Sequence, residues 1–155
     1  MIELQILTDS LNKKKDILTK IVEENKNQEN ALKIEPVSLD DFDAIVDKKA
    51  ALLDELGVLD SGFESVYDRI REQLVAEQSE HKAQISTMKA LISAITELSI
   101  TIQAQEERNK TLVEKFFSQS RKDLQADRLR SKASYDYMNR RNSGEVAPRF
   151  LDTKS

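Results

Sequence analysis

The chain has 155 residues, which is the size of one domain and leaves no room for a second sizeable hydrophobic core. Leucine, isoleucine, valine and phenylalanine make up 42 of them, about 27%, above the roughly 20% below which charged chains stay unfolded. The absence of cysteine excludes disulfide frameworks, thiolate metal sites and cysteine nucleophiles. With 34% charged residues, three glycines and two prolines, the composition predicts an all-α protein with long helices.

Charge is divided unevenly along the chain. Residues 120–155 carry nine basic and five acidic side chains, a net charge of +4, whereas residues 1–119 carry a net charge of −8. This division indicates two regions with different partners. An acidic body disfavours nucleic acid, because phosphates dominate the affinity of such complexes and are repelled by carboxylates.

The sequence gives no sign of secretion or membrane insertion. The N-terminus lacks a basic start followed by an apolar stretch, so it does not resemble a signal peptide. The uncharged stretch Leu98–Gln105 has eight residues, whereas about 20 apolar residues are needed to span a bilayer. We therefore expect a soluble, cytoplasmic protein.

A first long helix is predicted over residues 2–33. Its apolar seam follows a heptad pattern and consists of Leu4, Leu7, Leu11, Leu18, Ile21 and Leu32. The same seam contains the polar residues Lys14, Asn25 and Gln28. Two interpretations remain open: these three residues lie on a half-exposed edge, or they fix the register against a neighbouring helix as polar core residues do in coiled coils.

Pro36 ends this helix, because proline lacks a hydrogen-bond donor and disfavours helical geometry in the residue before it. Ser38 is a good N-cap, and Asp40 and Asp41 follow in the first turn, where the helix dipole favours anions. A second helix is therefore predicted over residues 38–76. Its heptad pattern continues past Gly57 and Gly62, so these glycines indicate a bend in the helix and not an end.

The same pattern continues from Leu74 to Phe116 and, taken literally, describes one very long helix. Val75–Lys82 lacks a strong apolar seam residue, so we place a turn there and a third helix over residues 82–119. The core residues expected to be buried are Leu53, Leu56, Ile70 and Ile92. The predicted architecture is an elongated antiparallel bundle of three long helices over residues 1–119.

Apolar density falls in the basic segment 120–155. Ala126, Leu129, Ala133 and Tyr137 form one weak stripe, which predicts a short helix over residues 122–140. A glycine and a proline follow at 144 and 148, and we expect the remaining residues to be disordered.

Catalytic chemistry is poorly represented. His81 is the single histidine, so neither a histidine-based triad nor a multi-histidine metal site can be built. Glu77 lies four residues before it and could share a metal with it, but a solvated histidine in a turn is the simpler interpretation. Without a glycine-rich phosphate loop, nucleotide chemistry is also disfavoured. We predict no enzyme activity, no metal and no cofactor.

Binding residues are expected towards the C-terminus. Phe116 and Phe117 form either the packed end of the bundle or an apolar docking surface. Further on, apolar and aromatic side chains alternate with basic ones in a mixture typical of binding anchors, although tyrosines also occur in unstructured tails. The candidates in this segment are Arg128, Leu129, Lys132, Tyr135, Tyr137 and Met138.

Two stretches resemble the flagellar export chaperones of the FlgN and FliT type: Phe42–Leu56, with the sequence FDAIVDKKAALLDEL, and Gln105–Leu112, with the sequence QEERNKTL. Lys49 with Leu53 matches the lysine and leucine of that family's second helix. Asn109 with Leu112 matches its Asn-x-x-Leu motif. The resemblance covers residues 1–119, and these matches look structural.

The resemblance implies a cytoplasmic chaperone that keeps a late flagellar subunit, of the hook-associated or filament-cap type, unpolymerised and delivers it to the type III export gate. It also implies that the basic C-terminal segment contacts the client. We expect the protein itself to be a monomer or a homodimer. The competing interpretation is a structural coiled-coil adaptor, in which the same apolar seams drive homodimerisation.

Overall fold

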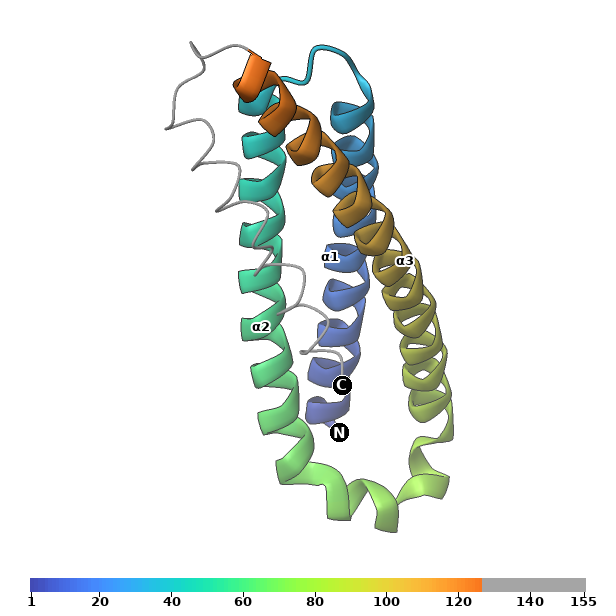
Figure 1. Cartoon of the computed structure of the whole chain (residues 1–155). Coiled ribbons are helices and arrows are strands. Elements are labelled where there is room, and N and C mark those ends of the chain that lie inside the picture. The colour runs from blue at the N-terminus through green and yellow to red at the C-terminus, as the bar shows by residue number, and fades with distance from the viewer. Residues whose placement is uncertain (127–155) are drawn as a thin grey trace.

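The computed structural model describes residues 1–126, with side chains through Asp123, and is built of helices (Figure 1). Helix α1 covers Ile2–Lys33, α2 covers Leu39–Ala76, the short 3-10 helix η1 covers Gln78–His81, and α3 covers Lys82–Ala126. The part of the chain described contains no β-strand. The predicted all-α fold is confirmed.

The turn between α1 and α2 follows from the local sequence. The last turn of α1 ends with the Ile34 amide donating to the Asn30 carbonyl at 3.1 Å, just before Pro36. Ser38 then caps α2, because its hydroxyl accepts a hydrogen bond from the Asp41 amide at 3.2 Å. Asp40 and Asp41 lie in the first turn, where their charges favour the helix N-terminus.

The second turn forms without glycine or proline. The Glu77 amide still donates to the Gln73 carbonyl at 2.9 Å, and the Glu80 amide then donates to the Glu77 carbonyl at 3.0 Å in the tighter 3-10 geometry. None of the η1 residues is buried. The missing apolar seam over these residues leaves nothing to hold a continuous helix against a neighbour, so the chain reverses.

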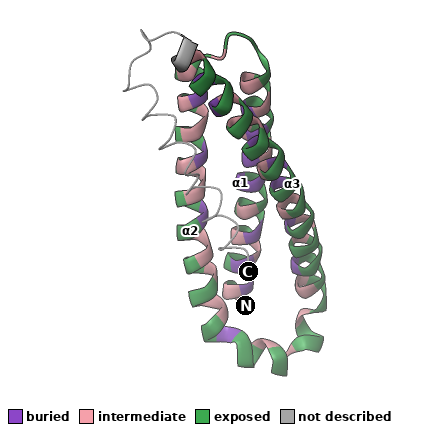
Figure 2. Cartoon of the chain, viewed as in Figure 1, coloured by how far each residue is buried: buried purple, intermediate pink, exposed green. Residues whose placement is uncertain are grey.

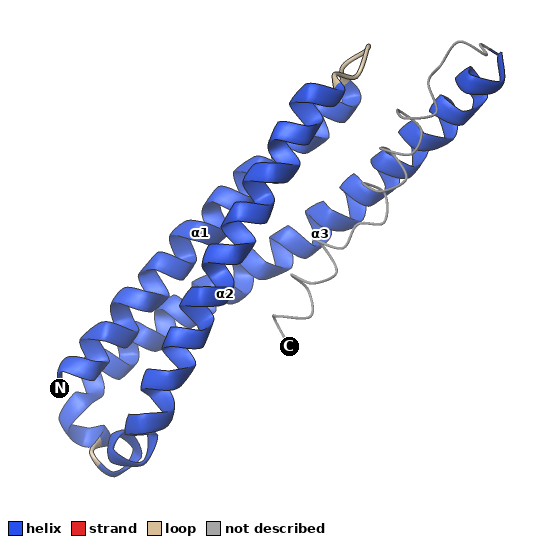
Figure 3. Cartoon of the chain, turned by 90° about the vertical axis from the view of Figure 1, so that its left-hand side faces the viewer, coloured by secondary structure: helices blue, strands red, loops and turns tan. Residues whose placement is uncertain are grey.

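The three long helices run up, down and up, so that α1 and α3 are parallel and α2 is antiparallel to both (Figure 1). Helix α1 packs against both α2 and α3, which scarcely touch each other in the described part of the chain. Turned by 90°, the molecule shows α1 and α2 side by side and α3 diverging from them towards its C-terminal end (Figure 3). Helix α1 is thus the central element.

The buried residues lie on the inner faces of the helices (Figure 2). The main core cluster comprises Leu4, Leu7, Leu11, Ile17, Leu18, Ile21, Leu56, Ile70, Met88, Ile95 and Ile102. Leu56 and Ile70 are buried as predicted, and Leu53 is half-buried. Ile92 was expected in the core but is 46% exposed. The buried stripe of α3 follows Met88, Ile95 and Ile102, and the half-buried Leu91 flanks it, which leaves Ile92 on the outer side.

Helix α3 is longer than the sequence suggested. It continues through Ala126, whereas an end at residue 119 was expected. No helix breaker lies in this stretch, and Ser120, 2% exposed, continues the pattern of buried positions past the expected end. The first residues assigned to a separate helix over 122–140 therefore belong to α3. The rest of that prediction and the expected disorder lie outside the described residues.

Candidate functional site

A cluster of buried polar side chains lies where all three long helices meet, and we call it the polar layer. It comprises Asn25 and Gln28 of α1, Lys49 of α2, and Gln105, Glu106 and Asn109 of α3. Asn25 is 1% exposed and Asn109 is 3% exposed. Polar groups buried to this degree are stable only when they are hydrogen-bonded.

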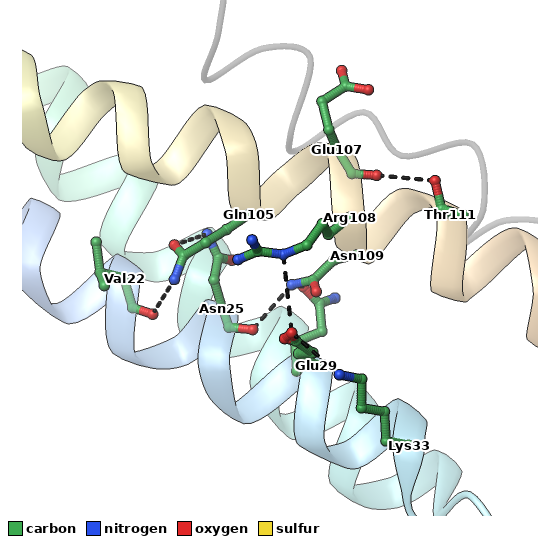
Figure 4. Close-up of polar contacts among 10 residues, drawn as sticks. Val22, Asn25, Glu29, Lys33, Gln105, Glu107, Arg108, Asn109 and Thr111 are labelled. Carbon is green, nitrogen blue, oxygen red and sulfur yellow. Dashed lines mark hydrogen bonds and ion pairs between the residues drawn. The ribbon is translucent and has the colours of Figure 1, made fainter.

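Amide side chains connect α1 to α3 in this layer (Figure 4). The Asn25 side-chain amide donates to Gln105 Oε1 at 3.1 Å, and the Gln105 amide donates to the Val22 carbonyl at 3.1 Å. The Asn109 side-chain amide donates to the Asn25 carbonyl at 3.0 Å and to Gln28 Oε1 at 3.1 Å. The two helices are thereby held at one axial offset.

Lys49 brings α2 into the same network. Its Nζ donates to Gln28 Oε1 at 3.0 Å and forms an ion pair with the Glu106 carboxylate at 2.8 Å. The side chains of Lys49 and Glu106 are only 7% and 11% exposed, so each charge depends on the other for compensation. The ion pair therefore joins α2 and α3, which otherwise scarcely touch.

Of the two interpretations of the polar seam residues, the half-exposed edge is wrong for Asn25 and Gln28. Both are buried and make contacts that depend on the register of α1 against its neighbours. Lys14 is different, because it forms an ion pair with Asp60 of α2 at 2.8 Å with both side chains partly exposed. Ion pairs at such positions contribute little to stability.

Two of the eight candidate client-binding residues are described, and they differ in exposure. Phe116 is half-buried, whereas Phe117 is 1% exposed, with the Arg121 guanidinium 5.3 Å from its ring centroid. The distance is consistent with a cation–π contact. The other six, Arg128, Leu129, Lys132, Tyr135, Tyr137 and Met138, lie outside the described residues.

The α2–α3 turn gathers possible metal ligands. The sequence pointed to Glu77 and His81, and the 3-10 turn adds Glu80, so that one ligand atom of each lies within 4.8 Å of the others. The His81 ring is held by Gln84 at 3.1 Å from Nδ1, and its Nε2 lies 3.9 Å from the Glu77 carboxylate. A contact between residues four apart on the chain explains this pair without an ion.

The middle part of α3 is poor in charge, since Glu97 is the single charged residue between Lys89 and Glu106. By length and composition alone, the stretch Gln78–Asp123 contains a window apolar enough to cross a membrane, and only 17% of that window is buried. The buried stripe against α1 accounts for part of this apolar character. Ile92 and Ile100, 46% and 62% exposed, account for another part and lie on the surface. Sequence reasoning missed this surface because it assigned Ile92 to the core.

The family model described as FlgN protein matches residues 1–140, nine-tenths of the chain. The chain belongs to the FlgN family. FlgN proteins are flagellar export chaperones. Chaperones of this family are in general soluble cytoplasmic proteins, and the family is not known to contain enzymes. Comparison with curated proteins and with solved structures gave no match.

In this FlgN-family chain, the residues that carried the resemblance have a structural role. Lys49 and Asn109 both bind Gln28 Oε1 in the polar layer. Their motif partners Leu53 and Leu112 are half-buried, one on α2 and one on α3. The family match extends beyond Ala126 into the basic segment, which the sequence had assigned to client contact.

Proposed function

We propose that this chain binds a late flagellar structural subunit of the hook-associated or filament-cap type, keeps it unpolymerised, and delivers it to a component of the type III export gate. In this proposal the client contact is made by the end of α3 and the basic segment that follows. The candidates are Phe116, Phe117, Arg128, Leu129, Lys132, Tyr135, Tyr137 and Met138. No catalytic step, metal or cofactor is involved.

The observation that carries this proposal is the family match over residues 1–140, which spans the helical body and the start of the basic segment. The charge division supports the proposal. A segment of net charge +4 attached to a body of net charge −8 indicates that the two regions contact different partners. Alternating aromatic and basic side chains supply typical anchors for a protein partner.

The charge-poor middle part of α3 gives a second, independent reason to expect a protein partner. Ile92 and Ile100 are exposed on a helix whose surface window contains few charges. Export subunits that polymerise through amphipathic helices present an apolar stripe, which an apolar helix surface can cover. We therefore extend the proposed contact to this side of α3.

The coiled-coil adaptor is less well supported. That interpretation required the apolar seams to be available for a second copy. The seam residues Leu4, Leu18 and Leu56 are instead buried by the helices of the same chain. Cytoplasmic location follows from the chaperone proposal and shares its test.

The proposal is tested with a purified hook-associated subunit from the same organism as the probe. Light scattering follows its polymerisation with and without the chain, and calorimetry measures the affinity. Leu129→Ala with Tyr137→Ala should weaken binding at least about 30-fold, because truncated aromatic anchors commonly cost about 2 kcal/mol or more. Charge reversal at Arg128 and Lys132 should mainly slow association and flatten its salt dependence.

The matched control is Val58→Ala on α2, since Val58 is 77% exposed and outside the proposed contact. It should bind and suppress polymerisation like wild type. If neither a hook-associated nor a filament-cap subunit binds the wild-type chain, the proposed function is wrong.

A further inference from the structure

Helices α2 and α3 flank α1 without covering each other. Helix α1 packs against both, whereas α2 and α3 scarcely touch within the described residues. Figure 1 shows the two helices on either side of α1 over the half of the bundle nearest the α2–α3 turn. The flanks that α2 and α3 turn towards each other in that half are therefore not covered by another helix.

The flank of α3 that faces α2 is identified by Glu106. Its carboxylate forms the ion pair with Lys49 of α2 at 2.8 Å, so this side of α3 is turned towards α2. Ile92 and Ile85 lie two and three heptads before Glu106, and residues at heptad spacing lie close to the same side of a helix. Ile85 is half-buried, and Ile92 is 46% exposed. This flank is thus apolar and only partly covered.

The flank of α2 that faces α3 is identified through α1. Gln28 Oε1 joins α2 to α3 in the polar layer and so marks the side of α1 that lies between those two helices. Lys14, two heptads earlier, lies on the same side and forms its ion pair with Asp60 of α2 at 2.8 Å. Asp60 therefore lies on the flank that borders α3. The other residues at heptad spacing on this flank are half-buried and apolar: Leu53, Tyr67 and Leu74.

The two flanks together form an apolar strip, which we call the open side and which comprises Leu53, Tyr67, Leu74, Ile85 and Ile92. Tyr67 is held in place by stacking on Phe63, with ring centroids 6.2 Å apart and an angle of 12° between the planes. The described residues contain no β-strand, so no sheet edge is available to an extended peptide. A helix lying along α2 and α3 would instead repeat its side chains at the spacing of the strip.

The two helices that border the open side differ in charge. Helix α2 carries ten acidic and four basic side chains, a net charge of −6. Asp54 and Asp68, which follow Leu53 and Tyr67 in the chain, are exposed. The part of α3 opposite is poor in charge, with Glu97 the single charged residue between Lys89 and Glu106. Charge complementarity therefore favours basic residues on the side of a docked helix that lies along α2.

We propose that the open side docks an amphipathic helix of a partner protein, which places its apolar stripe on Tyr67 and Ile92 and its basic residues beside Asp54 and Asp68. The docking is a property of the helical body of the chain. The assignment of this helix to the export client rests on the function proposed above. It gives the client a second contact, separate from the basic segment.

Two synthetic peptides of about 20 residues, which form about 30 Å of helix, test the docking on the full chain. Both carry the same leucine stripe, and the residues beside the stripe are lysine in one peptide and glutamate in the other. Fluorescence anisotropy measures their affinities. The lysine peptide should bind at least about tenfold more tightly at low salt, and added salt should reduce this difference by screening. Equal affinities, or no binding of the lysine peptide, would overturn the proposal.

Variants of the chain locate the bound peptide. Ile92→Asn should weaken binding of the lysine peptide roughly tenfold, because an apolar contact is lost without a change in charge. Val58→Asn is the matched control, since Val58 of α2 is 77% exposed and outside the open side, and it should bind like wild type. Asp54→Lys with Asp68→Lys should abolish the preference for the lysine peptide and tests the site even if Ile92→Asn does not fold. Wild-type binding by folded Ile92→Asn would place the peptide elsewhere and refute the proposal.

A variant of the basic segment distinguishes a partner helix from the chain's own residues. Leu129→Ala with Tyr137→Ala should leave the affinity for the lysine peptide unchanged. A gain of about tenfold or more would show that the segment itself competes for the open side, and the proposal would be wrong.

Competition with the client separates this proposal from the proposed function. A hook-associated subunit should displace the lysine peptide from the full chain. If the subunit binds the chain without displacing the peptide, the proposed function stands and the assignment of the docked helix to the client is wrong. If the peptide binds as expected and no subunit binds at all, the docking site stands and the proposed function is wrong.

Discussion

The side-chain amide of Asn109 on α3 donates a hydrogen bond to Gln28 Oε1 on α1, and the same oxygen accepts one from Lys49 of α2 at 3.0 Å. A single glutamine oxygen thus joins all three long helices. Because each bond fixes an axial position, a slip of one helical turn would leave buried polar groups without partners. The arrangement therefore sets the register of the bundle.

The first prediction concerns the ion pair of the polar layer. Lys49→Met leaves the Glu106 carboxylate, 11% exposed, without its counter-ion and should lower the free energy of unfolding by about 3 kcal/mol. The double variant Lys49→Met with Glu106→Leu removes both charges and should recover most of that loss. Urea denaturation measures both. A double variant less stable than the single one would contradict this account of the pair.

The second prediction concerns the apolar core. Leu56→Ala and Ile70→Ala should each lower the free energy of unfolding by about 2–5 kcal/mol, through lost apolar burial and a residual cavity. Ile92→Ala is the control, because a side chain that is 46% exposed should cost less than about 1 kcal/mol. Equal losses at all three positions would place Ile92 in the core. They would contradict the orientation of α3 described above, in which Ile92 lies on the outer side.

The third prediction concerns the N-cap of α2. Ser38→Ala removes the acceptor of the Asp41 amide and should cost about 1 kcal/mol. Ser61→Ala, at an exposed position within α2, should be neutral or slightly stabilising, since alanine is the better helix former. Thermal melts of both variants check the difference. The same loss at both positions would indicate that Ser38 does not act as a cap.

Much of the fold could be read from the sequence because its signals are local. Pro36 and the Ser38 cap mark the first turn, and the gap in the apolar seam between Val75 and Lys82 marks the second. The heptad positions gave most of α1's core, including Leu4 and Leu18. Each of these signals depends on residues close together in the chain.

The errors arose where the outcome depends on contacts between helices. Periodicity identifies a polar residue in a seam, but the partners of Asn25 and Gln28 lie about 80 positions away on α3 and 21 away on α2. Ile92 and Leu91 are neighbours in the sequence, and which of them is packed depends only on which side of α3 faces α1. The candidate client contact has the same dependence, because it involves a second protein.

The fourth prediction concerns oligomeric state. The apolar seams are used within one chain, so the free protein should be a monomer in light scattering after size-exclusion chromatography. It should form a one-to-one complex with its client. An obligate dimer, in which a second copy covers the exposed apolar surface, would favour the adaptor interpretation instead.

The central claim is that the client is held by the end of α3 and the basic segment beyond it. Titration calorimetry of a hook-associated subunit against the full chain and against a chain truncated after Ala126 tests it most directly, because the truncation keeps all of the described part of α3. We predict that the truncated chain melts like the full chain and loses about 100-fold or more in affinity, as expected when several anchors are removed together. Full affinity in the truncated chain would contradict the claim and assign the client to the helical body.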